Sequence, residues 1–203
     1  MSKITVQKSK SSAQNLNGSA QGKSLNGTSA KAIVSSQTPR QLATPTDLSP
    51  EAVRAILEAV NPILADSFAL YLKTKNFHWH MSGSHYRDYH LLLDEQADSI
   101  FASIDELAER VRKIGGTTLR SVSHVSQLQT IRDDNDDFVA PGDMIRRLLN
   151  DNRQIAQSQR EALQLADEHN DAPTNDLLQQ ILNETERRIW FLFEISQGGE
   201  NTQ

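Results

Sequence analysis

Cysteine is absent from this sequence of 203 residues, which excludes a disulfide framework, thiolate metal ligands and a cysteine nucleophile. Long apolar runs are also missing. The longest runs, residues 68–72 and 189–193, fall far short of the ~20 residues that cross a bilayer, so we expect no membrane partner. Residues 1–30 contain no apolar stretch typical of a secretory signal. These absences favour a cytoplasmic protein.

Acidic and aromatic residues are both missing from residues 1–46. The charged side chains of this segment are all basic: Lys3, Lys8, Lys10, Lys23, Lys31 and Arg40. Small and polar residues fill most other positions, so the segment cannot bury enough apolar surface to offset its ordering entropy. We therefore predict a disordered basic arm over residues 1–46 and a folded domain over residues 47–203. The domain holds the remaining 15 of the 21 basic residues and all 26 acidic ones, a net charge of −11.

Charge alone leaves two interpretations of the arm equally open. The arm is either a solubilising tail or a tether that binds nucleic acid through its cations, which are thinly spread over the segment. A transit peptide is a weaker third interpretation, because the arm has a single arginine and little amphipathicity. Contacts of lysine with phosphate are independent of base sequence. The tether interpretation therefore predicts non-specific DNA binding and association with the nucleoid.

Glycine and proline are sparse, and they divide the domain into long segments with helical periodicity. We predict long helices at about 50–80, 85–114, 142–169 and 173–197. Ser49 is suited to cap the first helix and Pro50 to start it, whereas Pro62 is expected to kink or split it. Residues 122–131 carry apolar side chains at three-residue steps, which indicates a small helix in the middle connection. The predicted fold class is all-α: a ferritin-like four-helix bundle with a short extra helix in the middle crossover connection.

The second predicted helix carries two stripes of side chains. The apolar stripe repeats at alternating four- and three-residue steps, as in a bundle core, and consists of Leu93, Ala97, Ile100, Ile104, Leu107, Val111 and Ile114. The polar stripe lies about a third of a turn away and consists of His90, Asp94, Asp98, Asp105 and Glu109. Like charges at i, i+4 spacing cost a helix a few tenths of a kcal/mol unless they are neutralised. The polar stripe is either a solvated acidic face or a face that binds a cation.

Distance limits how this polar stripe can hold a cation. Asp94 and Asp105 are eleven residues apart, or about 16 Å along a helix, too far for one ion with ligands at about 2 Å. An antiparallel copy of the helix would instead set His90 and Asp94 of one chain against Asp105 and Glu109 of the other. Such a two-fold interface creates two equivalent sites, roughly 22 Å apart. A tight turn between the first two helices would bring His78 to the same place.

Residues 63–116, and more loosely the whole domain, resemble the Dps family, the starvation-induced DNA-binding mini-ferritins. The family pattern has His-Trp at the end of the first helix, H-x-x-x-D twelve residues later and D-x-x-x-E-R eleven residues beyond that Asp. The residues that match this pattern are His78, Trp79, His90, Asp94, Asp105, Glu109 and Arg110. A set of ligands at fixed offsets is far more specific than a lone H-x-x-x-D.

The resemblance implies an enzyme, a ferroxidase that oxidises Fe(II), typically with hydrogen peroxide, and stores Fe(III) as a mineral. It implies a dodecameric homo-oligomer with iron as the bound metal. Each iron site would take ligands from two chains: His78, His90 and Asp94 from one, Asp105 and Glu109 from its two-fold mate. The alternative is a non-catalytic, nucleoid-compacting or structural stress protein with the same shell fold.

Other residues belong to weaker predictions. Trp79, His80 and Asp98 are candidates for a redox or outer role beside the iron, although His80 is expected at the surface. The turn between the last two long helices resembles the family's iron-entry pore, with Asp167, Glu168, Asp171 and Asp176. The chain contains no Glu-x-x-His motif, which argues against a diiron site built within one subunit's bundle.

Overall fold

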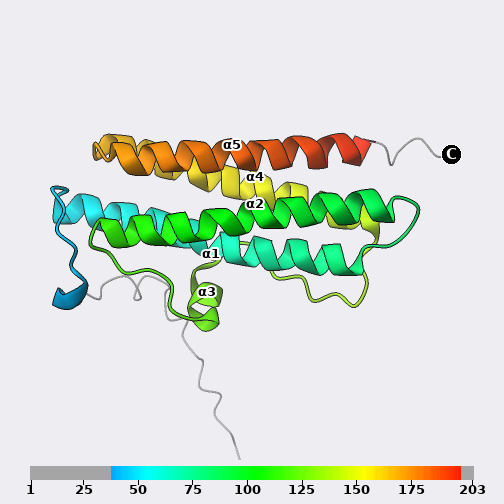
Figure 1. Cartoon of the computed structure of the whole chain (residues 1–203), viewed down its shortest axis with the longest axis horizontal. Coiled ribbons are helices and arrows are strands. Elements are labelled where there is room, and N and C mark those ends of the chain that lie inside the picture. Colours follow the sequence, from blue (N-terminus) through cyan, green and yellow to red (C-terminus); the bar gives the residue numbers. More distant parts are fainter. Residues whose placement is uncertain (1–37, 198–203) are drawn as a thin grey trace, which may run out of the picture. The chain divides into compact units, whose positions relative to one another are not determined.

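The computed structural model describes residues 38–197, and within this range it contains helices and no strand. The four long helices are α1 (Pro50–His80), α2 (Tyr86–Lys113), α4 (Pro141–Glu168) and α5 (Ala172–Gln197) (Figure 1). The short helix α3 (Val122–Leu128) lies in the connection that runs from the end of α2 back to the start of α4. The predicted all-α four-helix bundle with a short helix in its crossover is confirmed.

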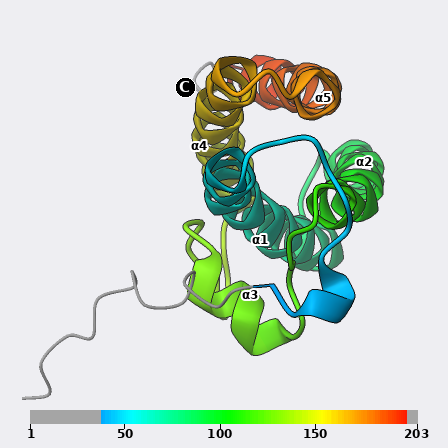
Figure 2. The ribbon, with the colours of Figure 1, turned by 90° about the vertical axis from the view of Figure 1, so that its left-hand side faces the viewer.

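Apolar packing holds the four long helices together. Helix α1 packs against both α2 and α4, and α5 packs mainly against α4 (Figure 2). The contact between α2 and α5 is the smallest among the pairs of long helices that touch extensively. Every residue of the predicted apolar stripe on α2 is buried. That stripe therefore forms part of the bundle core, as its spacing indicates.

Helix α1 is continuous, so of the two effects expected of Pro62, a kink or a split, the split does not occur. The helix begins where predicted, because the Ser49 hydroxyl accepts a hydrogen bond from the Ala52 amide (3.1 Å) and Pro50 occupies the first turn. Pro62 lies within the helix. Buried residues lie on both sides of it, including Val60 and Leu64, so tertiary packing outweighs the one backbone hydrogen bond that proline removes.

Among the described helices, α1 alone is long and apolar enough to cross a membrane by length and composition. Its apolar side chains are largely buried within the bundle, where they pack against α2 and α4. It also buries two charged residues, Asp66 and Lys73, which bind groups of the α3–α4 region. Mixed burial of this kind is typical of the core helix of a water-soluble bundle.

The connection around α3 is fastened to α1 by a buried carboxylate. Asp66 is 1% exposed and accepts hydrogen bonds from the Thr130 amide (2.5 Å), the Thr130 hydroxyl (2.7 Å) and the Ile131 amide (2.9 Å). Two turns further on, Lys73 pairs with Asp151 of α4 (2.8 Å). Buried backbone amides need such partners when no regular structure provides them. Asp66 thus fixes where the crossover turns towards α4.

Part of the predicted arm lies against the folded domain. Residues 38–46 include a single 3-10 turn, η2 (Arg40–Leu42), and the Leu42 carbonyl accepts a hydrogen bond from the Arg112 guanidinium (2.8 Å). Gly115 has φ +83°, and a Cβ there would lie 2.7 Å from the Thr44 carbonyl oxygen, so glycine is required for this close approach. Residues 42 and 44 thus lie against the loop that follows α2 and its last turn. The rest of the predicted arm, residues 1–37, lies outside the described residues.

Replacing Asp66 with asparagine tests the role of this carboxylate. The amide retains one acceptor oxygen and loses the charge, so bonds from three donors are weakened in a buried setting. We expect a loss of roughly 2–4 kcal/mol in the free energy of unfolding, measured in urea. Asp137→Asn, at an exposed position of the same connection, is the matched control and should change stability by less than about 0.5 kcal/mol. Equal stabilities of the two variants would contradict this role.

Candidate metal centre

The turn between α1 and α2 brings two histidines into contact. Helix α1 ends at His80, and α2 begins at Tyr86 after a turn in which Gly83 adopts φ +91°. The imidazole rings of His78 and His90 stack with their centroids 3.7 Å apart and an interplanar angle of 19°. The predicted approach of these two residues across a short antiparallel turn is therefore present in the structure.

Each of these histidines is oriented by the backbone of the other. His78 Nδ1 lies 2.7 Å from the carbonyl oxygen of His90, and His90 Nδ1 lies 2.9 Å from the carbonyl oxygen of His78. A carbonyl oxygen only accepts hydrogen bonds, so each Nδ1 must donate, and in the neutral ring the lone pair then resides on Nε2. This tautomer presents both Nε2 atoms as metal ligands, and the carbonyls hold the rings in place.

Asp94 supplies a carboxylate next to these imidazoles. Its Oδ1 atom lies 3.8 Å from His78 Nε2. It also accepts a hydrogen bond from the Lys75 ammonium, which lies 4.0 Å from Asp98 as well. The hydrogen bond from Lys75 is the main cause that holds the pKa of Asp94 below its ordinary value, and the nearby histidines lower it further. The same contact raises the pKa of Lys75. The structure therefore favours an ionised carboxylate at Asp94 with an ammonium as its partner.

Lys75 is a site residue that the sequence argument missed. It lies one turn before His78 on α1, and the i, i+3 spacing sets the two side chains on neighbouring parts of the helix surface. That spacing was the available signal. The ring of Tyr86, whose centroid lies 5.0 Å from that of His90, was missed as well.

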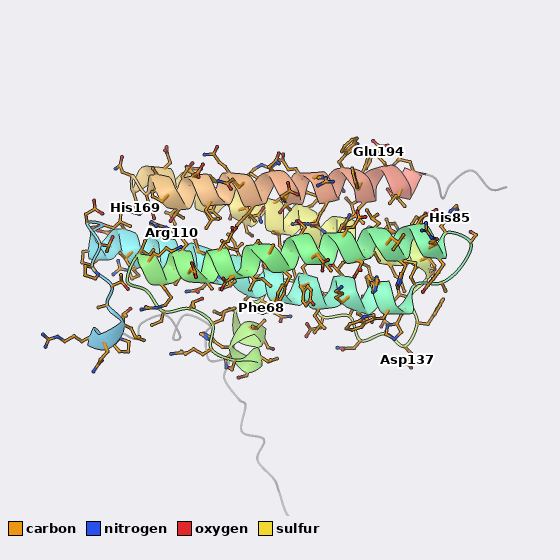
Figure 3. All side chains as sticks on the ribbon, in the orientation of Figure 1. Phe68, His85, Arg110, Asp137, His169 and Glu194 are labelled. Atoms are coloured by element: carbon orange, nitrogen blue, oxygen red, sulfur yellow. The ribbon has the colours of Figure 1, made fainter. Side chains whose placement is uncertain are left out.

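The remaining predicted ligands lie further along α2, towards the end marked by Arg110 and away from the end marked by His85 (Figure 3). Asp105 and Glu109 are both exposed, and Glu109 pairs with Lys113 (2.9 Å). No three histidine or carboxylate side chains of the described residues are grouped closely enough to hold a metal ion. One chain thus brings His78 against His90 and within 3.8 Å of Asp94, and it leaves Asp105 and Glu109 apart from them, so the five-ligand site stays a prediction.

The residues assigned an outer or redox role are all at the surface. Trp79 is 61% exposed, and Asp98 is exposed at the edge of the pair formed by Lys75 and Asp94. His80 is exposed, and its Nδ1 atom bonds to the carbonyl of Asn76 (2.8 Å). Within the described residues, no hydrogen bond or ion pair joins Trp79 or His80 to Asp94. Their roles beside a metal stay predictions.

The predicted pore residues divide into two groups. Asp167, Glu168 and Asp176 are exposed around the turn between α4 and α5, where Asp167 and Asp176 line a depression of about 380 Å³. Asp171 is instead 2% exposed and pairs with Arg110 of α2 (2.6 Å). It also accepts hydrogen bonds from the amide (3.2 Å) and hydroxyl (2.5 Å) of Thr174. Asp171 therefore fastens the turn to α2 and, unlike the other three predicted pore residues, does not face solvent.

Comparison with known proteins gives consistent matches. The Ferritin-like domain family matches residues 57–199. DNA protection during starvation protein 1 of Deinococcus radiodurans is 30% identical over 71% of this chain and 70% of its own length. An uncharacterized low temperature-induced protein of Nostoc sp. is 32% identical, over 74% of this chain and 85% of its own length.

Solved structures give the same result. DpsC from Streptomyces coelicolor superposes with a TM-score of 0.72 at 32% identity, covering 74% of this chain and 88% of its own. A Dps protein from Vibrio cholerae, described as a member of a broad superfamily of ferritin-like diiron-carboxylate proteins, gives a TM-score of 0.70 at 25% identity, covering 75% and 96%.

Replacing Lys75 with methionine tests whether its ammonium competes with a metal cation for Asp94. The change keeps the length of the side chain and removes the positive charge, so a divalent cation should bind more tightly. We expect the affinity for Co(II), followed by its visible absorption, to rise by roughly three- to tenfold. Lys75→Arg retains the charge and should bind Co(II) like the parent. Unchanged affinity in Lys75→Met would contradict the competition.

Proposed function

The chain belongs to the Dps family of ferritin-like proteins, and from this premise we propose that it binds Fe(II) as a substrate, oxidises it and stores the ferric product. The observation that carries the proposal is the pair of histidines locked with both Nε2 atoms free to act as ligands. Asp94 adds a carboxylate beside them. Ferrous iron accepts imidazole and carboxylate ligands readily, whereas ferric iron favours the carboxylates.

The site is completed by a second copy of the chain in this proposal. His78, His90 and Asp94 come from one subunit, and Asp105 and Glu109 come from the two-fold mate. Both acidic residues are exposed on α2 in the single chain, which leaves them available to a partner. Phe101, 55% exposed near the middle of the same stripe, would supply apolar contact at the two-fold axis. The interface would thus join an apolar centre to two metal sites at its edges.

The proposed chemistry is the oxidation of Fe(II) by hydrogen peroxide. Each peroxide accepts two electrons, so two ferrous ions are oxidised for each peroxide consumed. The protein's contribution is to hold the ion in a fixed ligand set with positions open to the oxidant. Removing both reactants together would suppress the formation of hydroxyl radicals. The ferric product would leave the site and mineralise inside a dodecameric shell.

Iron entry is assigned to the turn between α4 and α5. Asp167, Glu168 and Asp176 are exposed there, so they remain available to attract cations. Asp171 is excluded because its carboxylate is occupied by Arg110 and Thr174. In this proposal the buried pair holds the turn in place while the exposed carboxylates face the solvent.

Mixing two defective variants tests whether the site is shared between chains. One variant carries His78→Ala and Asp94→Ala, and the other carries Asp105→Ala and Glu109→Ala, so each alone lacks half of every site. In a two-fold dimer of unlike chains, one site combines both intact halves and the other combines both defective halves. Random assembly of equal amounts should therefore restore about a quarter of the parent's initial rate of Fe(II) oxidation by peroxide.

The matched control mixes variants that are defective in the same half. His90→Ala assembled with the His78→Ala, Asp94→Ala variant should restore no activity, because no intact site can form. If unlike halves also fail to restore activity while shells assemble normally, the shared site is wrong. If each variant alone oxidises iron like the parent, these five residues are not the site of oxidation. If the parent oxidises Fe(II) no faster than buffer with peroxide, the ferroxidase assignment itself fails, and the non-catalytic stress protein becomes the better description.

We further propose that the N-terminal segment binds DNA non-specifically. The specific observation is the charge asymmetry of the sequence, since a domain with a net charge of −11 repels phosphate while the segment over residues 1–46 carries only basic charges. Curated relatives bear the name DNA protection during starvation protein. A cytoplasmic, nucleoid-associated location follows from this proposal. Among the basic residues, Arg40 is described and exposed, and Lys3, Lys8, Lys10, Lys23 and Lys31 lie outside the described residues.

Replacing the five lysines of residues 1–37 with glutamine tests this proposal. Duplex retardation in gel-shift titrations should be lost at salt concentrations where the parent still binds, because fewer counterions are released on binding. Replacing the same lysines with arginine keeps the charge and should leave retardation near that of the parent. Oxidation of Fe(II) should be unchanged in both variants. Equal retardation by the glutamine variant would contradict the tether.

A further inference from the structure

A buried arginine without an acidic partner lies between α2 and α5. Arg188 is 7% exposed, and no carboxylate of the described residues lies within 4.0 Å of its guanidinium. Its hydrogen bonds go to three neutral oxygens: Asn152 Oδ1 (2.9 Å), Ser99 Oγ (3.1 Å) and Thr185 Oγ1 (2.8 Å). Burial lowers the pKa of Arg188 to about 10, with the charge of Glu184 opposing the shift. A buried cation without an adjacent anion is costly to the fold.

Beside Arg188, a second buried hydrogen-bond donor has no acceptor within the described residues. Gln96 of α2 is 5% exposed, and its Nε2 atom has no hydrogen-bond acceptor within the described part of the chain. Arg188 has five N–H donors and uses three of them in the bonds above, so two remain. Buried donors of this kind are normally satisfied by a protein group, water or a ligand.

Both groups line the same cavity. It measures about 260 Å³, and its walls include Gln96 and Ser99 of α2 and Arg188 and Phe191 of α5. It lies between α2 and α5, the pair with the smallest contact among the long helices that touch extensively. The acidic residues of its lining are at least partly exposed, and Glu184 is already paired with Arg187 (3.7 Å). The buried donors are therefore one cation, Arg188, and one neutral amide, Gln96, while the acidic groups are screened by solvent.

We infer that this cavity binds a small oxyanion of the inorganic phosphate class. A tetrahedral oxyanion would accept hydrogen bonds from the guanidinium and from the Gln96 amide, and it would supply the negative charge that Arg188 lacks. The volume suits a small anion. The exposed carboxylates at the rim disfavour large polyanions such as nucleic acid.

The oxyanion site is separate from the candidate iron site. Gln96 follows Asp94 by two residues, and two residues turn a helix by about 200°, so the two side chains lie on nearly opposite sides of α2. A second subunit that covers the polar stripe of α2 would therefore leave the cavity uncovered. The inference does not depend on iron oxidation, and the two can fail independently.

Binding of inorganic phosphate to the full-length protein tests the inference. At constant ionic strength adjusted with chloride, phosphate should raise the thermal unfolding temperature in a saturable way, because it binds only the folded state. Gln96→Leu should weaken phosphate binding roughly tenfold while keeping the arginine. Gln157→Leu, an exposed glutamine on α4, is the matched control and should bind phosphate like the parent. Arg188→Met should abolish the effect.

Crystals grown with arsenate locate the anion directly. Arsenic scatters anomalously, so a peak beside Arg188 and Gln96 would support the site, and peaks only elsewhere would overturn it. The thermal unfolding measurement is a second test of the same site. If phosphate produces no saturable shift, or if Gln96→Leu and Gln157→Leu respond alike, no oxyanion site exists in this cavity. The comparison of Gln96→Leu with Gln157→Leu remains valid even if Arg188→Met fails to fold.

Discussion

The rise of an α-helix sets the main constraint on this protein. Asp94 and Asp105 share a stripe of α2, but eleven residues of helix separate them by about 16 Å. Bending the helix enough to bring them together would break the apolar stripe, whose members from Leu93 to Ile114 are all buried in the core. The core therefore keeps α2 straight, and straightness keeps the two halves of the ligand set apart. Any site that uses both halves must form between chains.

Within one half of the proposed metal site, the fold orients the ligands before a metal binds. The turn between α1 and α2 pairs His78 and His90 through each other's carbonyl groups, so neither ring needs to reorganise or change tautomer. Lys75 neutralises Asp94 in the single chain, which relieves the cost of a carboxylate close to other acidic groups. Two helices thus provide an oriented, charge-balanced half-site. The proposed exchange of an ammonium for a ferrous ion changes little else in the bundle.

Much of the fold could be predicted because it depends on local patterns. Helical periodicity, the Ser49 cap and the glycine positions placed the long helices within a few residues of their observed bounds. Whether Pro62 would split α1 could not be decided from the sequence, because the effect of an internal proline depends on packing from both sides, which no local pattern reveals. The contacts of residues 42 and 44 with Arg112 and Gly115 could not be predicted for a similar reason, since the partners lie far along the chain.

The residues of the candidate site also divide into those that local patterns reveal and those that depend on contacts between helices. The spacing of histidines and carboxylates is a property of one helix and of a family pattern, so it could be read from the sequence. Lys75, the reciprocal histidine bonds and the burial of Asp171 depend on contacts between helices. A carboxylate such as Asp171 looks identical in the sequence whether it faces solvent or an arginine. The family resemblance placed it among the pore carboxylates, and only the fold shows that Arg110 is its partner.

Anomalous scattering at the iron edge, from crystals soaked in ferrous iron without oxygen, tests the central claim most directly. The account predicts a peak near His78, His90 and Asp94 of one subunit that also lies against Asp105 and Glu109 of the partner subunit. Two such peaks should be related by the two-fold axis of each dimer. A peak enclosed by the four helices of a single subunit, with no ligand from a second chain, would contradict it.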